Sequence, residues 1–328
     1  MNIIIKFLKE SSVILFCRIW FQLARKARFD VKYIANSNRY QDWHKLQSDL
    51  AIRVHAIEKG MSIGNVKVGF GKPKALAIIN DFYHYLKIGG SKEMVAEWFS
   101  VLKKYSLFNK ELGGDMKEID SALEKFSRVT ELKDTGLGGI YVKNMTQTLA
   151  HLESSFAEFS QSRFSVRDFG QTKIEREQII EALKICERTP SACNRQPWSI
   201  FVYESEELKN KMFSLQGGCK GFYEDMQYAI LVCGDQRNYN INELYQVYVD
   251  GGLYGMNLLY ALHSKGLATI PLTMGHKFGE TQKIKSQMNI PEYDIPVILI
   301  GVGSYKKEYK VAASIRKNYS EYVKFDNK

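Results

Sequence analysis

The turn Arg163-Phe164-Ser165-Val166-Arg167 carries groups that bind anions. Two guanidiniums and one hydroxyl within five residues suit a phosphate or another polyanion. Charge-assisted hydrogen bonds of this kind contribute roughly 1.5–3 kcal/mol each. No nucleophile–base pair accompanies them, so the turn predicts binding and not acid–base chemistry. Taken alone, the same turn could also be a solvated basic surface.

A second segment, from Thr189 to Trp198, is a polar loop between a predicted helix and a predicted strand. Pro190 and Pro197 hold it extended, and Ser191 and Asn194 lie among small residues between them. Such a loop presents backbone groups and amides to a ligand. The alternative is a plain connection, although the loop is unusually polar and proline-rich for that.

Two further segments combine a strand end with a possible ligand contact. Ile270, Pro271 and Leu272 end an apolar run that could cover one face of a planar ring, or could simply be a buried strand. The run Ile300-Gly301-Val302-Gly303 is followed by a basic stretch that contains Arg316. A strand followed by glycines and then by a cation could form an anion-binding site. The same stretch could equally be an exposed tail on the surface.

The elements that must position these segments differ between the two halves of the chain. Apolar residues at helical spacing predict helices over 40–59, 73–87 and 92–105, and a glycine cluster at 135–139 predicts a domain boundary. We therefore expect a mainly helical domain over 1–140 and a second domain over 141–328. In the second domain, helices are predicted at 144–160, 174–188 and 241–264, and strands at 199–203, 228–233, 267–272 and 297–302.

The predicted helix over 241–264 is apolar around most of its circumference. Gly251 and Gly255, four residues apart, leave a flat patch that another backbone could approach closely. This favours a central helix at a subunit interface, and a core helix of a monomer is the alternative.

Charge and cysteine content narrow the class of protein. Residues 1–74 hold 14 Lys and Arg against 5 Asp and Glu, which accounts for nearly all of the net charge of +10. The five cysteines form no C-x-x-C pair, so we expect free thiols in a reducing, cytoplasmic compartment and no metal site. No basic motif interleaved with aromatics appears, which argues against nucleic-acid binding.

The N-terminal segment is apolar but interrupted by charge. Lys6, Lys9, Glu10 and Arg18 leave no run long enough to span a bilayer or to form a signal peptide. An amphipathic helix within residues 1–30 remains, ending in Arg25, Lys26 and Arg28. It could contact an anionic membrane surface peripherally, or it could pack on its own domain.

In order and spacing, the four segments resemble the nitroreductase family, whose members bind flavin mononucleotide (FMN). The likeness covers residues 144–328, and Pro190–Trp198 is its most specific part because it is close to a Ser-x-x-Asn-x-Gln-Pro-Trp signature. The resemblance implies an α+β fold with a central, mostly antiparallel sheet flanked by helices, preceded here by the helical domain. Phe164 stands where the family commonly has a second arginine, and the family's frequent proline before Arg316 is missing.

The resemblance also implies a role for each candidate residue. Arg163, Ser165 and Arg316 should bind the FMN phosphate, and Arg167 should lie at the pyrimidine edge of the flavin. Pro190, Ser191 and Asn194 should reach the flavin across the interface of a homodimer, while Ile270, Pro271 and Leu272 should cover the ring. Gln216, Gly217 and Lys220 match the family only loosely, as further polar contacts.

The implied activity is ping-pong hydride transfer from NADH or NADPH to a small acceptor such as a nitro compound, a quinone or another conjugated molecule. No side chain is predicted to be catalytic, because the flavin carries the redox chemistry. A rival enzyme would oxidise or dehalogenate one specific small molecule with little nicotinamide turnover.

The stretch from His55 to Ser62 resembles an N-terminal extension of nitroreductase-like proteins associated with surface-polysaccharide assembly. His55 and Glu58 share one helix face, as an acid–base or substrate-binding pair or as an ordinary surface pair. The alternative function is therefore a flavin-binding, membrane-peripheral partner protein in polysaccharide assembly.

Overall fold

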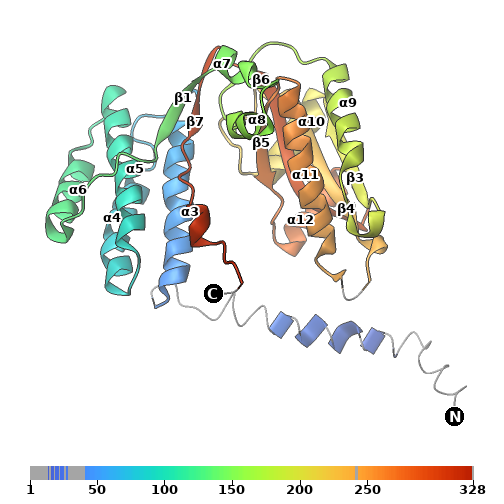
Figure 1. Cartoon of the computed structure of the whole chain (residues 1–328), viewed down its shortest axis with the longest axis horizontal. Coiled ribbons are helices and arrows are strands. Elements are labelled where there is room, and N and C mark those ends of the chain that lie inside the picture. The colour runs from blue at the N-terminus through green and yellow to red at the C-terminus, as the bar shows by residue number, and fades with distance from the viewer. Residues whose placement is uncertain are drawn as a thin grey trace, which may run out of the picture.

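Two units stand side by side in the structure, one made of helices alone and one built around a sheet (Figure 1). The computed structural model describes residues 14, 16–17, 19–21, 23–25, 27–28, 41–240 and 243–326. We call residues 41–139 the helical unit and residues 140–326 the sheet unit. The division of the chain into a domain over 1–140 and a second domain over 141–328 stays a prediction.

The helical unit is a bundle with one continuous apolar core. Its helices are α3 (Trp43–Met61), α4 (Lys72–Lys87), α5 (Lys92–Glu111) and α6 (Lys117–Thr130). Leu46, Leu50 and Val54 recur at helical spacing on α3 and are buried in this core. The predicted helices over 40–59, 73–87 and 92–105 are confirmed, whereas α6 had not been singled out.

The sheet unit contains a five-stranded sheet in which every pairing is antiparallel. Its strands follow the order β2-β6-β4-β3, and β5 pairs with β6. The bounds are β2 (Phe169–Gly170), β3 (Trp198–Tyr203), β4 (Tyr228–Asp235), β5 (Ala268–Thr273) and β6 (Asp294–Tyr305). All four strands predicted from the apolar runs are therefore confirmed.

Both faces of this sheet are buried because helices cover each of them. On β4, Ile230 and Val232 belong to the core shared with α9 (Arg176–Ile185) and α11 (Gln246–Ser264). The alternate residues Leu231 and Cys233 point the other way, into the core shared with α10 (Glu206–Gln216) and α12 (Phe278–Gln287). This is the α+β architecture with a flanked antiparallel sheet that was expected.

Gly251 and Gly255 serve the packing of α11 within its own chain. A Cβ at Gly251 would lie 2.6 Å from Val297 Cγ2, and one at Gly255 would lie 2.8 Å from Ile298 Cγ2. The glycines therefore let α11 approach β6 closely. The predicted close approach of another backbone at these glycines is confirmed, with β6 as the partner, and the placement of α11 at a subunit interface stays a prediction.

The predicted helix over 144–160 is broken into two. The first part is α7 (Met145–Ala150) and the second is α8 (Phe156–Ser162). The Ser155 hydroxyl accepts from Glu158 N at 3.4 Å and caps the start of α8, which explains why the helix restarts there. Similarly, α11 begins at Gln246, later than the predicted residue 241.

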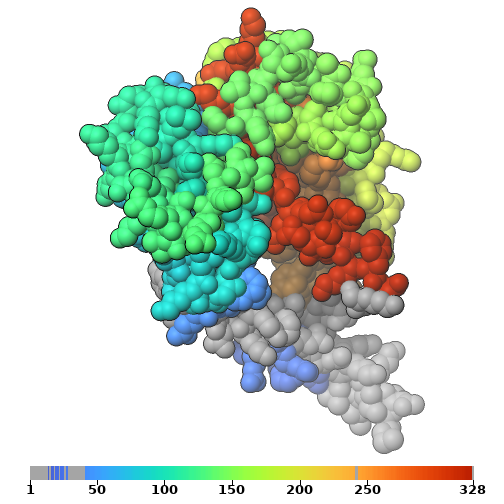
Figure 2. All heavy atoms as spheres, turned by 60° about the vertical axis from the view of Figure 1, so that its left-hand side comes forward, coloured from blue at the N-terminus to red at the C-terminus, as the bar shows by residue number. Residues whose placement is uncertain are grey.

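A two-stranded ribbon joins the units. Strand β1 (Ile140–Asn144) leaves the helical unit and pairs antiparallel with β7 (Glu308–Ala312), which follows β6. Beyond β7 the chain turns back, and Ala313 N donates to Gly139 O at 3.0 Å. The C-terminal segment consequently lies between the helical unit and the sheet unit, as the space-filling view shows in red (Figure 2).

Among the described residues, no helix is both long enough and apolar enough to cross a membrane.

Candidate functional site

The basic turn 163–167 lies against the start of β5. Ser165 forms a parallel bridge with Thr269, and Val166 N donates to Thr269 O at 2.9 Å. The turn follows α8 directly, so the end of that helix and the edge strand β5 fix its path. Two of the predicted segments, the basic turn and Ile270–Leu272, are therefore brought together.

Arg163 has a guanidinium nitrogen that is buried and lacks a hydrogen-bond partner among the described residues, Nη1. Burial lowers the pKa of Arg163, and the repulsion of nearby Arg316 lowers it further, against the opposing influence of Tyr260 and Tyr305. Arg316 is exposed, and its Nη1 donates to Ser314 O at 2.8 Å. The unpaired donor and the two neighbouring cations fit an anion such as a phosphate group.

Arg167 is a second buried cation, with an exposed fraction of 7%. Burial lowers its pKa to about 10, and the Glu58 carboxylate acts in the opposite direction. The one hydrogen bond found for it in the described chain runs from Nη1 to Ser165 O, at 3.4 Å. Arg167 is thus a buried guanidinium with spare donors near a carboxylate of the helical unit.

Helix α3 provides that carboxylate and forms one wall of the site. Glu58 is 3% exposed; its Oε1 accepts from Gly139 N at 2.9 Å, and its Oε2 lies 3.3 Å from His55 Nδ1. His55 Nδ1 also lies 3.5 Å from Ser314 Oγ, two residues before Arg316. The pairing of His55 and Glu58 is confirmed, but the pair contacts the sheet unit and is not an ordinary surface pair.

His263 lies behind Arg163 and was missed by the sequence reasoning. It is fully buried at the end of α11, where Nε2 lies 2.7 Å from Ser162 Oγ and Nδ1 lies 3.2 Å from Tyr305 OH. Burial, and then the charge of Arg163, lower its pKa to about 4. A single histidine within an apolar helical segment does not indicate, from sequence alone, that it contacts Ser162 and Tyr305.

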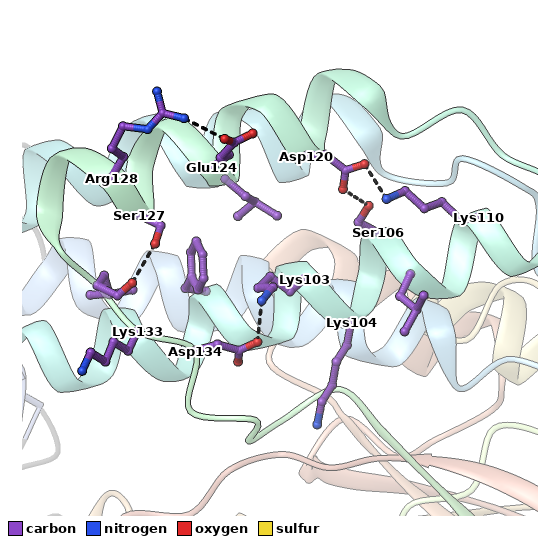
Figure 3. A pocket seen from close by; sticks show the side chains of 14 residues that line it. Lys103, Lys104, Ser106, Lys110, Asp120, Glu124, Ser127, Arg128, Lys133 and Asp134 are labelled. Carbon is purple, nitrogen blue, oxygen red and sulfur yellow. Dashed lines mark hydrogen bonds and ion pairs between the residues drawn. The ribbon is translucent and has the colours of Figure 1, made fainter.

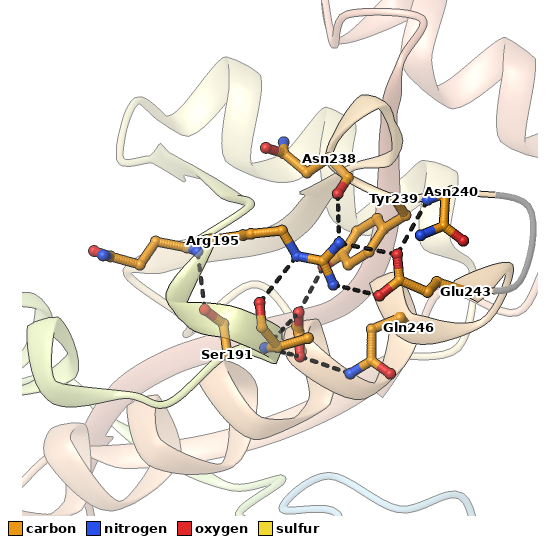
Figure 4. A network of polar contacts seen from close by, with 10 residues as sticks. Ser191, Arg195, Asn238, Tyr239, Asn240, Glu243 and Gln246 are labelled. Atoms are coloured by element: carbon orange, nitrogen blue, oxygen red, sulfur yellow. Dashed lines mark hydrogen bonds and ion pairs between the residues drawn. The ribbon is translucent and has the colours of Figure 1, made fainter.

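The proline-flanked loop, whose polar contacts Figure 4 draws, adopts a strained backbone. Cys193, Asn194 and Gln196 have φ values of 51°, 54° and 49°. Residues other than glycine seldom adopt this left-handed region of φ. Gln196 N donates to Ser191 Oγ at 2.9 Å, while Pro190 and Asn194 are exposed. Strain of this kind persists only where surrounding contacts over-determine it.

The contacts that hold this loop are made by Arg195 within it and by residues just before α11 and inside α11. Arg195 makes a bidentate pair with Glu243 at 2.7 and 2.9 Å and donates from Nε to Ala192 O at 2.9 Å. The buried Asp250 accepts from Ala192 N at 3.2 Å and from Tyr239 OH at 2.7 Å. Sequence reasoning had placed Arg195 in the loop but gave no indication of these partners.

Within the described part of the chain, no hydrogen bond or ion pair links the loop 189–198 to the basic turn. The predicted contact across a dimer interface therefore stays a prediction. Gln216, one of the loosely matched residues, donates from Nε2 to Thr273 O at 3.0 Å. It thereby ties the end of α10 to the end of β5, while Gly217 ends α10 in a left-handed conformation and Lys220 is exposed.

One cavity lies away from this constellation, and another adjoins it. One of about 900 Å³ lies between α5 and α6 (Figure 3), where Lys103 pairs with Asp134 at 2.8 Å and Arg128 pairs with Glu124 at 2.7 Å. Three of the cations that line it are paired with carboxylates, and Lys104 donates to Gly136 O and Gly138 O. A second cavity, of about 440 Å³, is lined by polar residues and by Ser162 and Phe164, beside the basic turn.

The fold and the site define an α+β domain with an antiparallel sheet and buried cations at one strand end. Residues 161–219, which include the basic turn and the proline-flanked loop, match the model of the nitroreductase family. The second half of the chain carries a nitroreductase family domain.

Known relatives match the same half. The chain is 28% identical over 161 residues to iodotyrosine deiodinase of Thermotoga neapolitana, covering 43% of this chain and 84% of the relative. It is 24% identical over 155 residues to FMN reductase (NAD(P)H) of Bacillus subtilis, covering 42% of this chain and 61% of the relative. Among solved structures, an FMN-dependent nitroreductase of Clostridium difficile R20291 is 17% identical, with a TM-score of 0.44 over 52% of this chain and 98% of that chain.

Proposed function

We propose that the protein is an FMN-dependent oxidoreductase that takes electrons from NADH or NADPH and reduces a small conjugated acceptor, such as a nitro compound or a quinone. The observation that carries the proposal is the buried, unpaired Nη1 of Arg163, with Arg316 beside it, in a nitroreductase family domain. A relative named FMN reductase supports the choice of cofactor.

Three side chains would hold the FMN phosphate. Arg163 offers its unpaired donor, Arg316 adds a second guanidinium, and the Ser165 hydroxyl lies in the same turn. Ile270, Pro271 and Leu272 form the adjoining edge strand that would cover the ring. Ile270 and Leu272 are buried, whereas Pro271 is partly exposed, as a residue that faces a ligand should be.

When bound, FMN supplies hydride-transfer chemistry between the nicotinamide and the acceptor. Arg167 would stabilise negative charge that develops at the pyrimidine edge, because it is a fixed, buried cation. Glu58 would hold Arg167 charged, since an adjacent carboxylate favours the guanidinium. Both substrates would use one open site in turn.

The protein would act as a homodimer through the outer face of α11. Tyr248, Val249, Leu253 and Met256 lie on this helix with exposed fractions between 37% and 51%. A patch of large apolar side chains on one helix typically marks an interface. In the dimer, Pro190, Ser191 and Asn194 would reach the flavin of the partner subunit.

The test compares FMN with riboflavin, which lacks the phosphate. The purified chain should bind FMN, turn yellow and bleach anaerobically when NADH or NADPH is added. Arg163→Gln should weaken FMN binding about 10- to 100-fold and leave riboflavin binding nearly unchanged. The control is Arg176→Gln, which removes an exposed guanidinium of α9 that pairs with Glu204.

Failure to take up FMN would refute the proposal, as would equal losses for the two flavins. Bleaching by a specific reductant but hardly by NADH or NADPH would instead favour the rival enzyme that oxidises or dehalogenates one compound. The relative named iodotyrosine deiodinase makes that rival worth testing.

A second candidate function is that of a cytoplasmic, membrane-peripheral flavoprotein that serves as a partner in surface-polysaccharide assembly. Phe16, Trp20 and Phe21 are largely exposed on the described part of the N-terminal helix, near the exposed Arg25 and Arg28. Aromatic and basic residues on one helix favour an anionic membrane interface. The wild-type chain should float with anionic liposomes in a salt-dependent manner, and the double variant Trp20→Ala/Phe21→Ala should not float. If the wild-type chain does not float, this candidate function is removed.

A further inference from the structure

One face of α3 is turned toward the proposed flavin site. His55, Glu58 and Lys59 are three and four residues apart, so they share this face. Glu58 contacts Gly139 N at 2.9 Å, and His55 contacts Ser314 Oγ at 3.5 Å, which fixes the face against the chain segment that leads to Arg316. Lys59 therefore extends from the same side of the helix.

The Lys59 ammonium has no hydrogen-bond or ion-pair partner in the described part of the chain, although the residue is only partly exposed. Burial lowers its pKa, and the charges of Arg167 and Lys74 lower it further. A half-buried ammonium that faces two other cations is unfavourable unless an anion joins it. None of the residues that the structure describes pairs an anion with this ammonium.

The charges around the site do not balance even with FMN present. Arg163 and Arg316 would be neutralised by the phosphate, and Glu58 is the carboxylate that acts on Arg167. Glu58 is already engaged by Gly139 N and His55. Two positive charges are left over on this side of the site, Lys59 and the Lys74 that acts on it, and Lys59 is the one on the face of α3 turned toward Arg167.

We propose that α3 supplies an anion subsite of the acceptor site, in which Lys59 binds a carboxylate carried by the acceptor and His55 borders it. The inference rests on the proposed function and deepens it, because it narrows the acceptor to an anionic conjugated molecule. It also gives the helical unit a role in specificity, since the sheet unit contributes neither residue.

The experiment uses the full chain loaded with FMN and two probes of similar size that are not reduced, benzoate and benzyl alcohol. Their binding is followed by the change in flavin absorption. Lys59→Met should weaken benzoate binding about 10-fold or more, because a charged partner is lost. Benzyl alcohol binding and FMN affinity should stay within about twofold, and Lys59→Arg should retain benzoate binding.

Lys87→Met is the matched control, because it removes an exposed lysine at the end of α4 and changes the net charge equally. Unchanged benzoate binding in Lys59→Met would overturn the subsite, and so would equal losses for the two probes. Both results leave FMN uptake and bleaching by NADH or NADPH intact. A wild-type chain that takes up no FMN overturns the proposed function, and the subsite with it.

Discussion

The buried histidine behind the basic turn should make the stability of the protein depend on pH. His263 is fully buried and its imidazole contacts Ser162 and Tyr305, while the charge of Arg163 opposes protonation. The perturbation is His263→Gln, which keeps an amide able to hydrogen-bond to Ser162 and removes the titrating group. The wild-type chain and this variant should respond differently to acid.

The size of the difference follows from the two pKa values. The folded-state pKa of His263 is about 4, against an ordinary value of 6.5. Since the folded state binds the proton less readily than the unfolded state, this contribution is complete above pH 6.5 and is lost as the pH falls toward 4. The linkage relation predicts that the free energy of unfolding is lower than at pH 8 by about 2 kcal/mol at pH 5 and by about 3 kcal/mol at pH 4.

The assay is urea unfolding of the protein without added flavin, at pH 8, 7, 6 and 5. The free energy of unfolding of the wild-type chain should fall between pH 7 and pH 5 by about 2 kcal/mol more than that of His263→Gln. The exposed His151, changed in the same way to glutamine, is the control and should retain the wild-type dependence. Parallel pH profiles for the wild-type chain and His263→Gln would refute the reasoning.

Three further outcomes are expected. Gly251→Ala should lower the free energy of unfolding by about 1–2 kcal/mol, because its methyl group would collide with β6. Gly279→Ala, in α12 and with open space around it, should raise that free energy by about 0.5 kcal/mol. Arg195→Lys should lose the bidentate contact with Glu243 and release the strained loop, which limited proteolysis would detect as faster cleavage. Leu253→Glu should convert a dimer into a monomer in light scattering while circular dichroism stays unchanged; a monomeric wild-type chain would contradict the proposed interface.

Local patterns were enough to predict most elements of the fold. The strands β3, β4, β5 and β6 are apolar, β-branched runs, and a buried antiparallel sheet requires such runs. Helix α6 gives a weaker signal because only three of its residues, Ile119, Leu123 and Phe126, are buried and most of the others are polar or charged. Their spacing does follow one helix face, so a stricter search for periodicity would have found it.

The candidate site was predictable only in part, because its contacts join distant segments. The basic turn and the proline-flanked loop have local signatures. The contacts of Glu58 with Gly139 and of Asp250 with Ala192 link residues 81 and 58 positions apart, and no local pattern records such pairs. The sequence predicts a close backbone approach at Gly251 but does not show that the partner is β6, since a sequence does not show which side of a helix faces the sheet.

The contact between His55 and Ser314 spans 259 positions along the chain. Helix α3 leaves the ribosome long before its partner segment has been translated, and domains generally fold in order of synthesis. The wall of the site made by α3 therefore stays open until Ser314 has emerged. A nascent chain from which Ser314 has not yet emerged can have its helical bundle, but it lacks the enclosure around Arg167.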